Sequence, residues 1–300
     1  MNSLYDQFKS SMISAIFSLV GKVWWKVAVI SLAQTFITFI AMIPLFVSVF
    51  NWSAFKGVFE DPEGWSQQIE QNPELIFSFL GDNPDFMGLA VSLSIFAVVV
   101  IIIQAWASHC VLLINQAEIT TGNSDLGEIL SQSFNSTLFR ILGGSLVLTI
   151  ISAFVGFIII ASAAISGWIT FFLFFGGILF LLRFTLVFPL IVHAEMSIGD
   201  ALSNSFKLLD WRRSGILFLA GIVFFIALVI AALMLGLFSL LLALIPIIGI
   251  IMYYLINILF QGVINAMTYG ALSGLYYRFT ELEIKKEDED ELSKHLISHE

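Results

Sequence analysis

The residues best able to do chemistry in this sequence are polar side chains inside long apolar stretches, and the most prominent is Arg183. A guanidinium placed against lipid costs about 2.5 kcal/mol or more, so it is expected to face protein, water or a ligand. Two interpretations stay open. In one, Arg183 snorkels or donates to backbone carbonyls freed near Pro189, whose ring leaves the carbonyl of Thr185 without its usual partner. In the other, it binds an anionic lipid headgroup or solute.

A second polar group lies on one face of a predicted membrane helix. Asn257, Gln261 and Asn265 follow one another at four-residue spacing, and Thr268 continues the same face. Such a stripe must point at protein or water, either to form helix–helix hydrogen bonds or to line a polar pathway. Together with Arg183, the three amides form the candidate polar or lipid site.

The sequence contains no recognisable catalytic set. Gln104, Ser108, His109 and Cys110 lie close together. Adjacent helical residues point about 100° apart, so His109 and Cys110 are expected to pack rather than to react as a pair. Metal-ligand spacings and the H-E-x-x-H, G-x-S-x-G and phosphate-loop patterns are absent. We therefore expect no catalytic residue, no metal and no cofactor, and an enzyme is disfavoured.

The composition identifies the elements that must position these side chains. Of the 300 residues, 59% are hydrophobic and 12% charged, against roughly 45–50% and about 25% in soluble domains. The net charge of -9 provides no basic surface for nucleic acid. Six apolar runs reach the length of about 20 residues that crosses a bilayer. They are residues 27–50, 86–114, 141–166, 168–192, 216–244 and 247–276. The predicted fold is all-α, a polytopic bundle of six transmembrane helices.

Basic residues gather at alternate ends of these runs, which predicts the orientation of the chain. They are Lys9, Lys22 and Lys26, then Arg140, then Lys207, Arg212 and Arg213, and finally Arg278, Lys285, Lys286 and Lys294. The connection 51–85 instead has seven acidic residues and one lysine. By the positive-inside rule, both termini are expected in the cytoplasm. No removed signal peptide is expected, and the first run is interpreted as a retained anchor.

An internal repeat organises the predicted helices. Residues 126–134 match residues 198–206 without a gap, at an offset of 198 − 126 = 72, and each segment precedes an odd-numbered span. Both are predicted to be amphipathic helices in the cytoplasmic interface, with Phe134 and Phe206 half-buried at equivalent positions. Asn123 or Ser124 is expected to cap the first of these helices, and Ser197 the second.

The N-terminal segment 5–19 has the same periodicity, so it is predicted to be a third interfacial helix without the motif. The predicted membrane domain 1–280 therefore consists of three pseudo-repeated units, about 1–115, 116–194 and 195–280. Residues 281–300 form a charged cytoplasmic tail that either continues span six as a helix or is disordered.

One region resembles a known family. It is the sequence of Arg183, Pro189 and Glu195, followed by Ala201, Ser205, Phe206, Lys207 and Leu208. This pattern resembles the membrane domain associated with bacterial glycerophosphodiester phosphodiesterases and related stand-alone multi-span membrane proteins of unassigned activity. The resemblance implies a multi-pass protein of the bacterial cytoplasmic (inner) membrane. No segment resembles the phosphodiesterase catalytic barrel, so that activity is not transferred.

The connection 51–85 is acidic yet rich in aromatic residues, which fits either anchoring at the outer interface or docking of a membrane protein partner. The expected function is a non-catalytic integral membrane scaffold or accessory subunit of a larger membrane complex. The alternative is a transporter or binding protein for lipid or a small anionic solute. Membrane lipids are expected partners, and nucleic acid is not.

Overall fold

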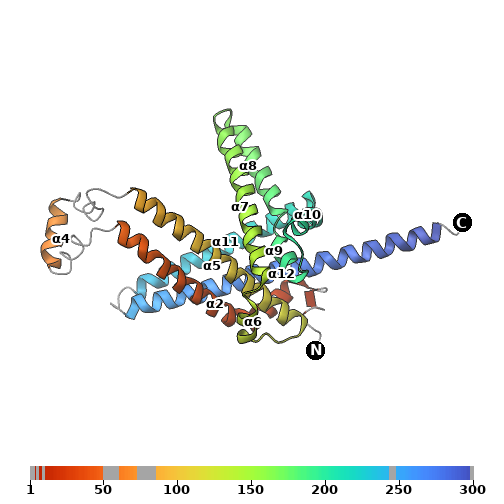
Figure 1. Ribbon diagram of the computed structural model, residues 1–300, viewed down its shortest axis with the longest axis horizontal. Coiled ribbons are helices and arrows are strands. Elements are labelled where there is room, and N and C mark those ends of the chain that lie inside the picture. The colour runs from red at the N-terminus through yellow and green to blue at the C-terminus, as the bar shows by residue number, and fades with distance from the viewer. Residues whose placement is uncertain are drawn as a thin grey trace. The chain divides into compact units, whose positions relative to one another are not determined.

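In the computed structural model, every regular element among the described residues is a helix (Figure 1). The described residues are 4, 7–8, 11–49, 61–72, 86–242 and 248–297. The long helices are α2 (Met12–Val49), α5 (Phe86–Thr120), α7 (Ser136–Ala163), α8 (Gly167–Leu182), α11 (Trp211–Leu242) and α12 (Ile248–Ile297). The short ones are α4 (Pro62–Gln71), α6 (Leu126–Gln132), α9 (Val187–His193) and α10 (Ile198–Leu208).

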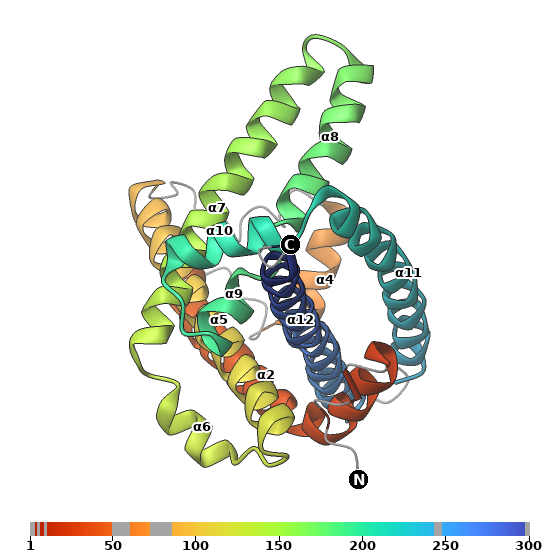
Figure 2. The same ribbon diagram turned by 90° about the vertical axis from the view of Figure 1, so that its right-hand side faces the viewer.

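Six segments of the described chain are long and apolar enough to cross a membrane, which confirms the predicted fold class of a multi-pass, all-α membrane protein. They are Met12–Leu45, Val91–Thr120, Ser136–Ala163, Gly167–His193, Trp211–Gly236 and Met252–Thr280. The third and fourth form a hairpin in which α7 and α8 run side by side (Figure 2). Its turn begins after Ala163, and Ser166 is the N-cap residue of α8, in agreement with the predicted break. The predicted break at Pro246 lies outside the described residues.

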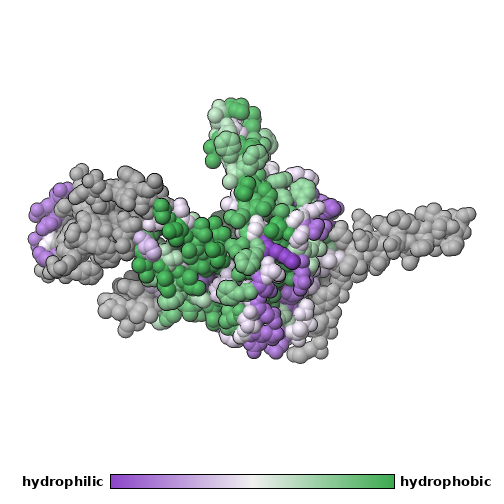
Figure 3. All heavy atoms as spheres, viewed as in Figure 1, coloured by the Kyte–Doolittle hydropathy of each residue, from purple (hydrophilic) through white to green (hydrophobic). Residues whose placement is uncertain are grey.

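The surface of the spans is apolar, as a lipid-facing surface requires. Large hydrophobic side chains such as Phe154, Phe172 and Val223 are exposed along α7, α8 and α11. Figure 3 shows hydrophobic residues over the α7–α8 hairpin and hydrophilic ones over the described part of α4. Patches of this extent are rare on soluble monomers and mark contact with a membrane or another protein.

The chain packs as two compact units, and each has its own contacts. One unit comprises Ala33–Gln104, and in it the side-chain amide of Gln34 donates to that of Gln104 at 2.6 Å. The other comprises Met1–Leu32 with Ala105–Glu300. This division describes how the chain packs and does not test the three predicted repeat units, which stay a prediction.

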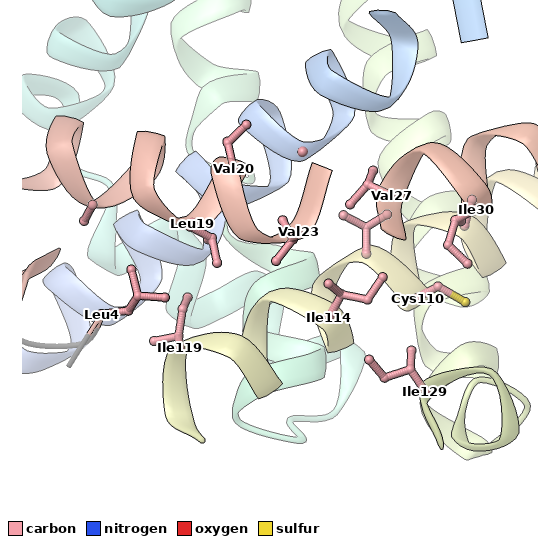
Figure 4. Packing of buried hydrophobic residues seen from close by; sticks show 14 of the residues in the cluster. Leu4, Leu19, Val20, Val23, Val27, Ile30, Cys110, Ile114, Ile119 and Ile129 are labelled. Atoms are coloured by element: carbon pink, nitrogen blue, oxygen red, sulfur yellow. The ribbon is translucent and has the colours of Figure 1, made fainter. Parts of the chain in front are cut away.

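The larger unit has two apolar clusters. In the first, side chains of α2, α5 and α6 meet, among them Val23, Ile114 and Ile129 (Figure 4). The second surrounds α9, where Leu190 and Ile191 pack with residues of α5, α7, α10 and α12. The two clusters bring the ends of several spans together around the short helices.

The short helices α6 and α10 bury equivalent positions of the repeat. Ile129 and Ala201 are buried, and so are Ser133 and Ser205, each pair at the offset of 72. Ser197 caps α10 as predicted, accepting from the backbone N–H of Asp200. The prediction for α6 is wrong, because the cap is neither Asn123 nor Ser124. The carboxylate of Asp125 accepts from the N–H groups of Gly127 and Glu128 instead.

The two phenylalanines of the repeat differ in environment. Phe206 belongs to α10 and is half-buried, as expected. Phe134 is 75% exposed, so the prediction of an equivalent half-buried position is wrong for this residue. The reason is local: Asn135 caps α7 by accepting from two backbone N–H groups, α6 therefore ends at Gln132, and Phe134 falls on the turn.

The N-terminal segment is also corrected. Met12 begins α2, which continues without interruption into the first span, so residues 12–19 do not form a separate interfacial helix. Residues 5, 6, 9 and 10 lie outside the described residues.

This segment shares a few positions with the repeat. Leu4, Asp6, Ser11, Phe17 and Gly21 match Leu126, Glu128, Ser133, Phe139 and Gly143 at an offset of 126 − 4 = 122. They match Ile198, Asp200, Ser205, Trp211 and Gly215 at 198 − 4 = 194. The N-terminal likeness is thus limited to these positions, whereas residues 126–134 and 198–206 match throughout. At the other end of the chain, α12 continues through Ile297, so the charged tail is helical as far as that residue.

Candidate functional site

Arg183 lies where the fourth span breaks into two helices. α8 ends at Leu182, Arg183 is its C-cap residue, and α9 begins at Val187. Pro189 falls in the first turn of α9, where a backbone N–H has no partner within the helix, so proline is accommodated without loss of a hydrogen bond. The break leaves the Arg183 side chain free to reach a neighbouring element.

That element is the C-terminal end of α10. The Nε of Arg183 donates to the carbonyl of Leu209 at 2.8 Å, and Nη2 donates to the carbonyl of Phe206 at 2.6 Å. Its Cζ lies 3.4 Å from the ring centroid of Phe206 and 5.3 Å from that of Trp211. Carbonyls at a helix C-terminus hold partial negative charge, which favours a cation there. Arg183 thus bonds to backbone carbonyls, but to those of α10 and not to those near Pro189.

Two further side chains hold the same end of α10. Arg213 donates from Nη1 to the carbonyl of Leu208 at 2.6 Å. The hydroxyl of Ser205 donates to the carbonyl of Arg183 at 2.7 Å and accepts from the N–H of Leu186 at 3.2 Å. The last turn of α10 and the break between α8 and α9 therefore satisfy each other's backbone groups.

The predicted polar stripe of span six makes mostly local contacts. Asn265 donates to the hydroxyl of Ser31 on α2 at 3.1 Å and accepts from the amide of Gln261 at 3.1 Å. Asn257 donates to the carbonyl of Tyr253 on its own helix at 3.0 Å. Within the part of the chain that the structure describes, only Asn265 among the three amides forms a hydrogen bond to another helix. These contacts join the stripe to α2 and Arg183 to α10, and among the described residues no shared contact unites the four predicted residues into one site.

A buried polar network that sequence reasoning missed surrounds Glu118. This glutamate is 5% exposed. One carboxylate oxygen lies 3.2 Å from the Nζ of Lys22, and the other accepts from the hydroxyl of Ser124 at 3.0 Å. Lys26 donates to the carbonyl and hydroxyl of Ser124, at 2.5 and 2.6 Å. In the sequence the two lysines indicate only the orientation of the chain, yet in the structure they connect α2 to α5 and to the loop that follows it.

The repeat contains a signal for this network. With a five-residue insertion in the connection before α6, the match extends toward the N-terminus at an offset of 195 − 118 = 77, which pairs Glu118 with Glu195. The same offset pairs Trp106 with Arg183. Trp106 stacks on Phe134 at 6.2 Å, as Arg183 lies over Phe206. A planar group therefore covers the repeat phenylalanine in both units.

Two histidines whose side chains the structure describes, His109 and His193, have structural contacts. The Nδ1 of His109 lies 3.1 Å from the carbonyl of Ser133, and the Nε2 of His193 lies 3.1 Å from the hydroxyl of Ser273. Cys110 is buried in the apolar cluster of α2, α5 and α6. Within the described ranges, no group of three or more His, Cys, Asp and Glu residues is arranged to hold a metal ion.

Asn115 differs from these residues, because it is fully buried and neither its amide nitrogen nor its oxygen has a hydrogen-bond partner in the described part of the chain. A buried amide without a partner is costly, so this position is a defined weak point of the helix packing.

Comparisons with protein-family models, with curated proteins and with solved structures gave no match to this chain. The resemblance described above therefore stays a prediction that rests on the quoted residues alone.

Proposed function

We propose that this protein is a non-catalytic integral membrane scaffold or accessory subunit of a larger membrane complex. The observation that supports it is the use made of Arg183, whose guanidinium joins the break in span four to the end of α10. A cation held by backbone carbonyls and covered by an aromatic ring stabilises a rigid framework. Asn265 also forms a structural contact, since its hydrogen bond to Ser31 links α12 to α2.

The partner-binding element in this proposal is the acidic, aromatic connection 51–85. Its described part includes α4, whose N-cap Asp61 accepts from the N–H of Gly64 at 3.0 Å, and Gln67 is exposed on this helix. A short capped helix between two spans is a suitable docking element for another membrane protein. We place the protein in a bacterial inner membrane. The distribution of lysine and arginine supports an orientation with this connection outside the cell and both termini in the cytoplasm.

The orientation is tested with single cysteines in a Cys110→Ser background. A cysteine at Gln67 should react with a membrane-impermeant thiol reagent from outside the cell, and a cysteine at Ser203 only from inside. Gln67 is preferable to Gly64, where an added Cβ would lie 2.2 Å from a carboxylate oxygen of Asp61. Reaction of both positions from the same side would refute the proposed orientation.

The scaffold function is tested by placing a photo-cross-linking residue at Gln67 in native membranes. One stoichiometric membrane protein should be captured there, and the same residue at Ser203 on α10 is the matched control. The scaffold proposal would be refuted by two results together: the residue at Gln67 captures no protein, and the chain purified from the same membranes is a monomer with lipid alone.

The alternative function is transport or binding of lipid or a small anionic solute. Gln261 supports it, because this amide is exposed on the span Met252–Thr280, and its hydrogen bond to Asn265 on the same helix keeps it at the helix surface. The purified chain in proteoliposomes distinguishes the two proposals. Flux of an anion or a labelled lipid that Gln261→Leu abolishes would support transport, whereas a scaffold gives no flux.

A further inference from the structure

Four basic residues lie at or near the junction of α10 and α11, and they divide into two kinds. Arg183 and Arg213 donate to the last carbonyls of α10. Lys207 and Arg212 are exposed and make no hydrogen bond or ion pair with any part of the chain that the structure describes. The second pair is therefore available to a ligand outside the protein.

The position of this pair fits the headgroup layer of a bilayer. Trp211 begins the apolar span Trp211–Gly236, and its ring is 56% exposed. Tryptophan at a span end settles at the depth of the lipid headgroups. Arg212 follows it directly, and Lys207 lies on the preceding amphipathic helix. Both cations are thus at the depth where lipid phosphates occur.

The local charge also favours an anion. Asp210 is the acidic residue between Lys207 and Arg212, and one oxygen of its carboxylate accepts from the backbone N–H of Arg213 at 2.7 Å. The segment 207–213 thus has three cations and one carboxylate, and Arg183 adds a fourth cation, while Arg183 and Arg213 are already engaged by carbonyls. The remaining positive charge has no counterpart in the described chain.

We infer that Lys207 and Arg212 bind the phosphate of an anionic phospholipid headgroup at the α10–α11 junction. A guanidinium donates in a fork that matches phosphate oxygens, and an ammonium adds a mobile point charge. The exposed ring of Trp211 contacts the glycerol and upper acyl region beside them. This site goes beyond the scaffold proposal and does not depend on it.

The repeat supplies a matched control. Arg140 occupies the position equivalent to Arg212, since 212 − 72 = 140, and it follows an exposed Phe139 as Arg212 follows Trp211. Its Nη1, however, donates to the carbonyl of Glu195 at 2.6 Å. The position equivalent to Lys207 is Asn135, which caps α7. The predicted repeat unit 116–194 therefore has equivalent positions, but their polar groups already form hydrogen bonds within the protein.

The test is phosphatidylglycerol binding to the full chain in detergent, measured by native mass spectrometry with phosphatidylcholine as competitor. The double variant Lys207→Gln with Arg212→Gln should lose affinity for phosphatidylglycerol by about tenfold or more, because two cation–phosphate contacts are removed. Arg140→Gln should bind as the wild type does. The charge-conserving pair Lys207→Arg with Arg212→Lys should retain binding.

Thermal unfolding of each variant gives the fold control, and no change is expected for the double variant because both side chains are exposed and unbonded. Unchanged phosphatidylglycerol affinity in a folded double variant would overturn the proposal. An equal loss in Arg140→Gln would also overturn it, because binding would then follow total charge and not this junction.

Discussion

The packing of α2 against α12 depends on Gly262, and replacing this glycine by alanine tests the arrangement directly. A Cβ added at Gly262 would lie 2.6 Å from the Cα of Ala28 and 2.7 Å from its Cβ. Favourable carbon–carbon contacts begin at about 3.5 Å, so the two helices would have to separate by about 0.9 Å. The obstructing atom belongs to the backbone, so a change of rotamer cannot relieve the overlap.

The magnitude is best expressed against a matched control, Gly221→Ala on α11, where an added Cβ has nothing within 4 Å. Alanine gains about 1 kcal/mol in helix propensity at both positions, so the difference between the variants isolates the packing term. Overpacking costs about 1–3 kcal/mol. The nearby hydrogen bond from Asn265 to Ser31 is worth about 0.6 kcal/mol more if it is lost. Gly262→Ala should therefore be about 2–4 kcal/mol less stable than Gly221→Ala.

The assay is equilibrium unfolding in mixed micelles, followed by circular dichroism as the denaturing detergent is raised. Gly270→Ala, where the nearest atom is the Leu19 Cδ2 at 3.5 Å, should resemble the Gly221 control. Adding Ala28→Gly to Gly262→Ala should restore only part of the stability, because the Cα at 2.6 Å remains. Equal stability of the Gly262 and Gly221 variants would refute the close approach of the two helices.

Three further substitutions test the buried polar groups by the same unfolding assay. Ser205→Ala should lower the free energy of unfolding by about 2 kcal/mol, because the carbonyl of Arg183 and the N–H of Leu186 both lose a partner. The control Ser203→Ala, on the exposed face of α10, should lower it by less than about 0.5 kcal/mol. Asn115→Leu should raise stability by about 1–2 kcal/mol, since it removes two buried unpaired polar atoms, and a loss instead would show that an ordered water or a ligand satisfies the amide. Glu118→Gln should destabilise by about 1–3 kcal/mol by weakening the pair with the half-exposed Lys22, and an unchanged midpoint would refute the role of this network.

The spans could be predicted from sequence because their signal is local. A run of about 20 apolar residues crosses a bilayer whatever its neighbours do. The helix ends were harder, because they depend on competition between nearby caps. Asp125, and not Ser124, starts α6, since the hydroxyl of Ser124 is used by Glu118. A nearby cap also explains the incorrect prediction for Phe134. Asn135, the residue after it, is the N-cap of α7, so Phe134 lies between two helices.

For the candidate site, the sequence predicted that Arg183 needs a partner but not which groups are its partners. The high cost of an exposed charge in lipid indicated that Arg183 must be satisfied internally or by a ligand. Which carbonyls satisfy it depends on where the end of α10 lies, and that is set by tertiary packing around Ser205. The network at Glu118 could not be predicted from spacing, because Lys22 and Glu118 are far apart in the sequence and meet only through the packing of α2 against α5. Extending the repeat to Glu195 would have drawn attention to it.

The break in span four has a consequence for how the chain is made. Arg183 is synthesised before its partners, because Leu209, whose carbonyl accepts from the Nε of Arg183, follows it by 26 residues. At a synthesis rate of about 5–20 residues per second, the guanidinium waits roughly 1–5 s for the end of α10. Until α10 has been made, the guanidinium cannot form the contacts that satisfy it in the folded protein. Because an unsatisfied charge in lipid is costly, we expect stable insertion of the fourth span to depend on the segment that follows it.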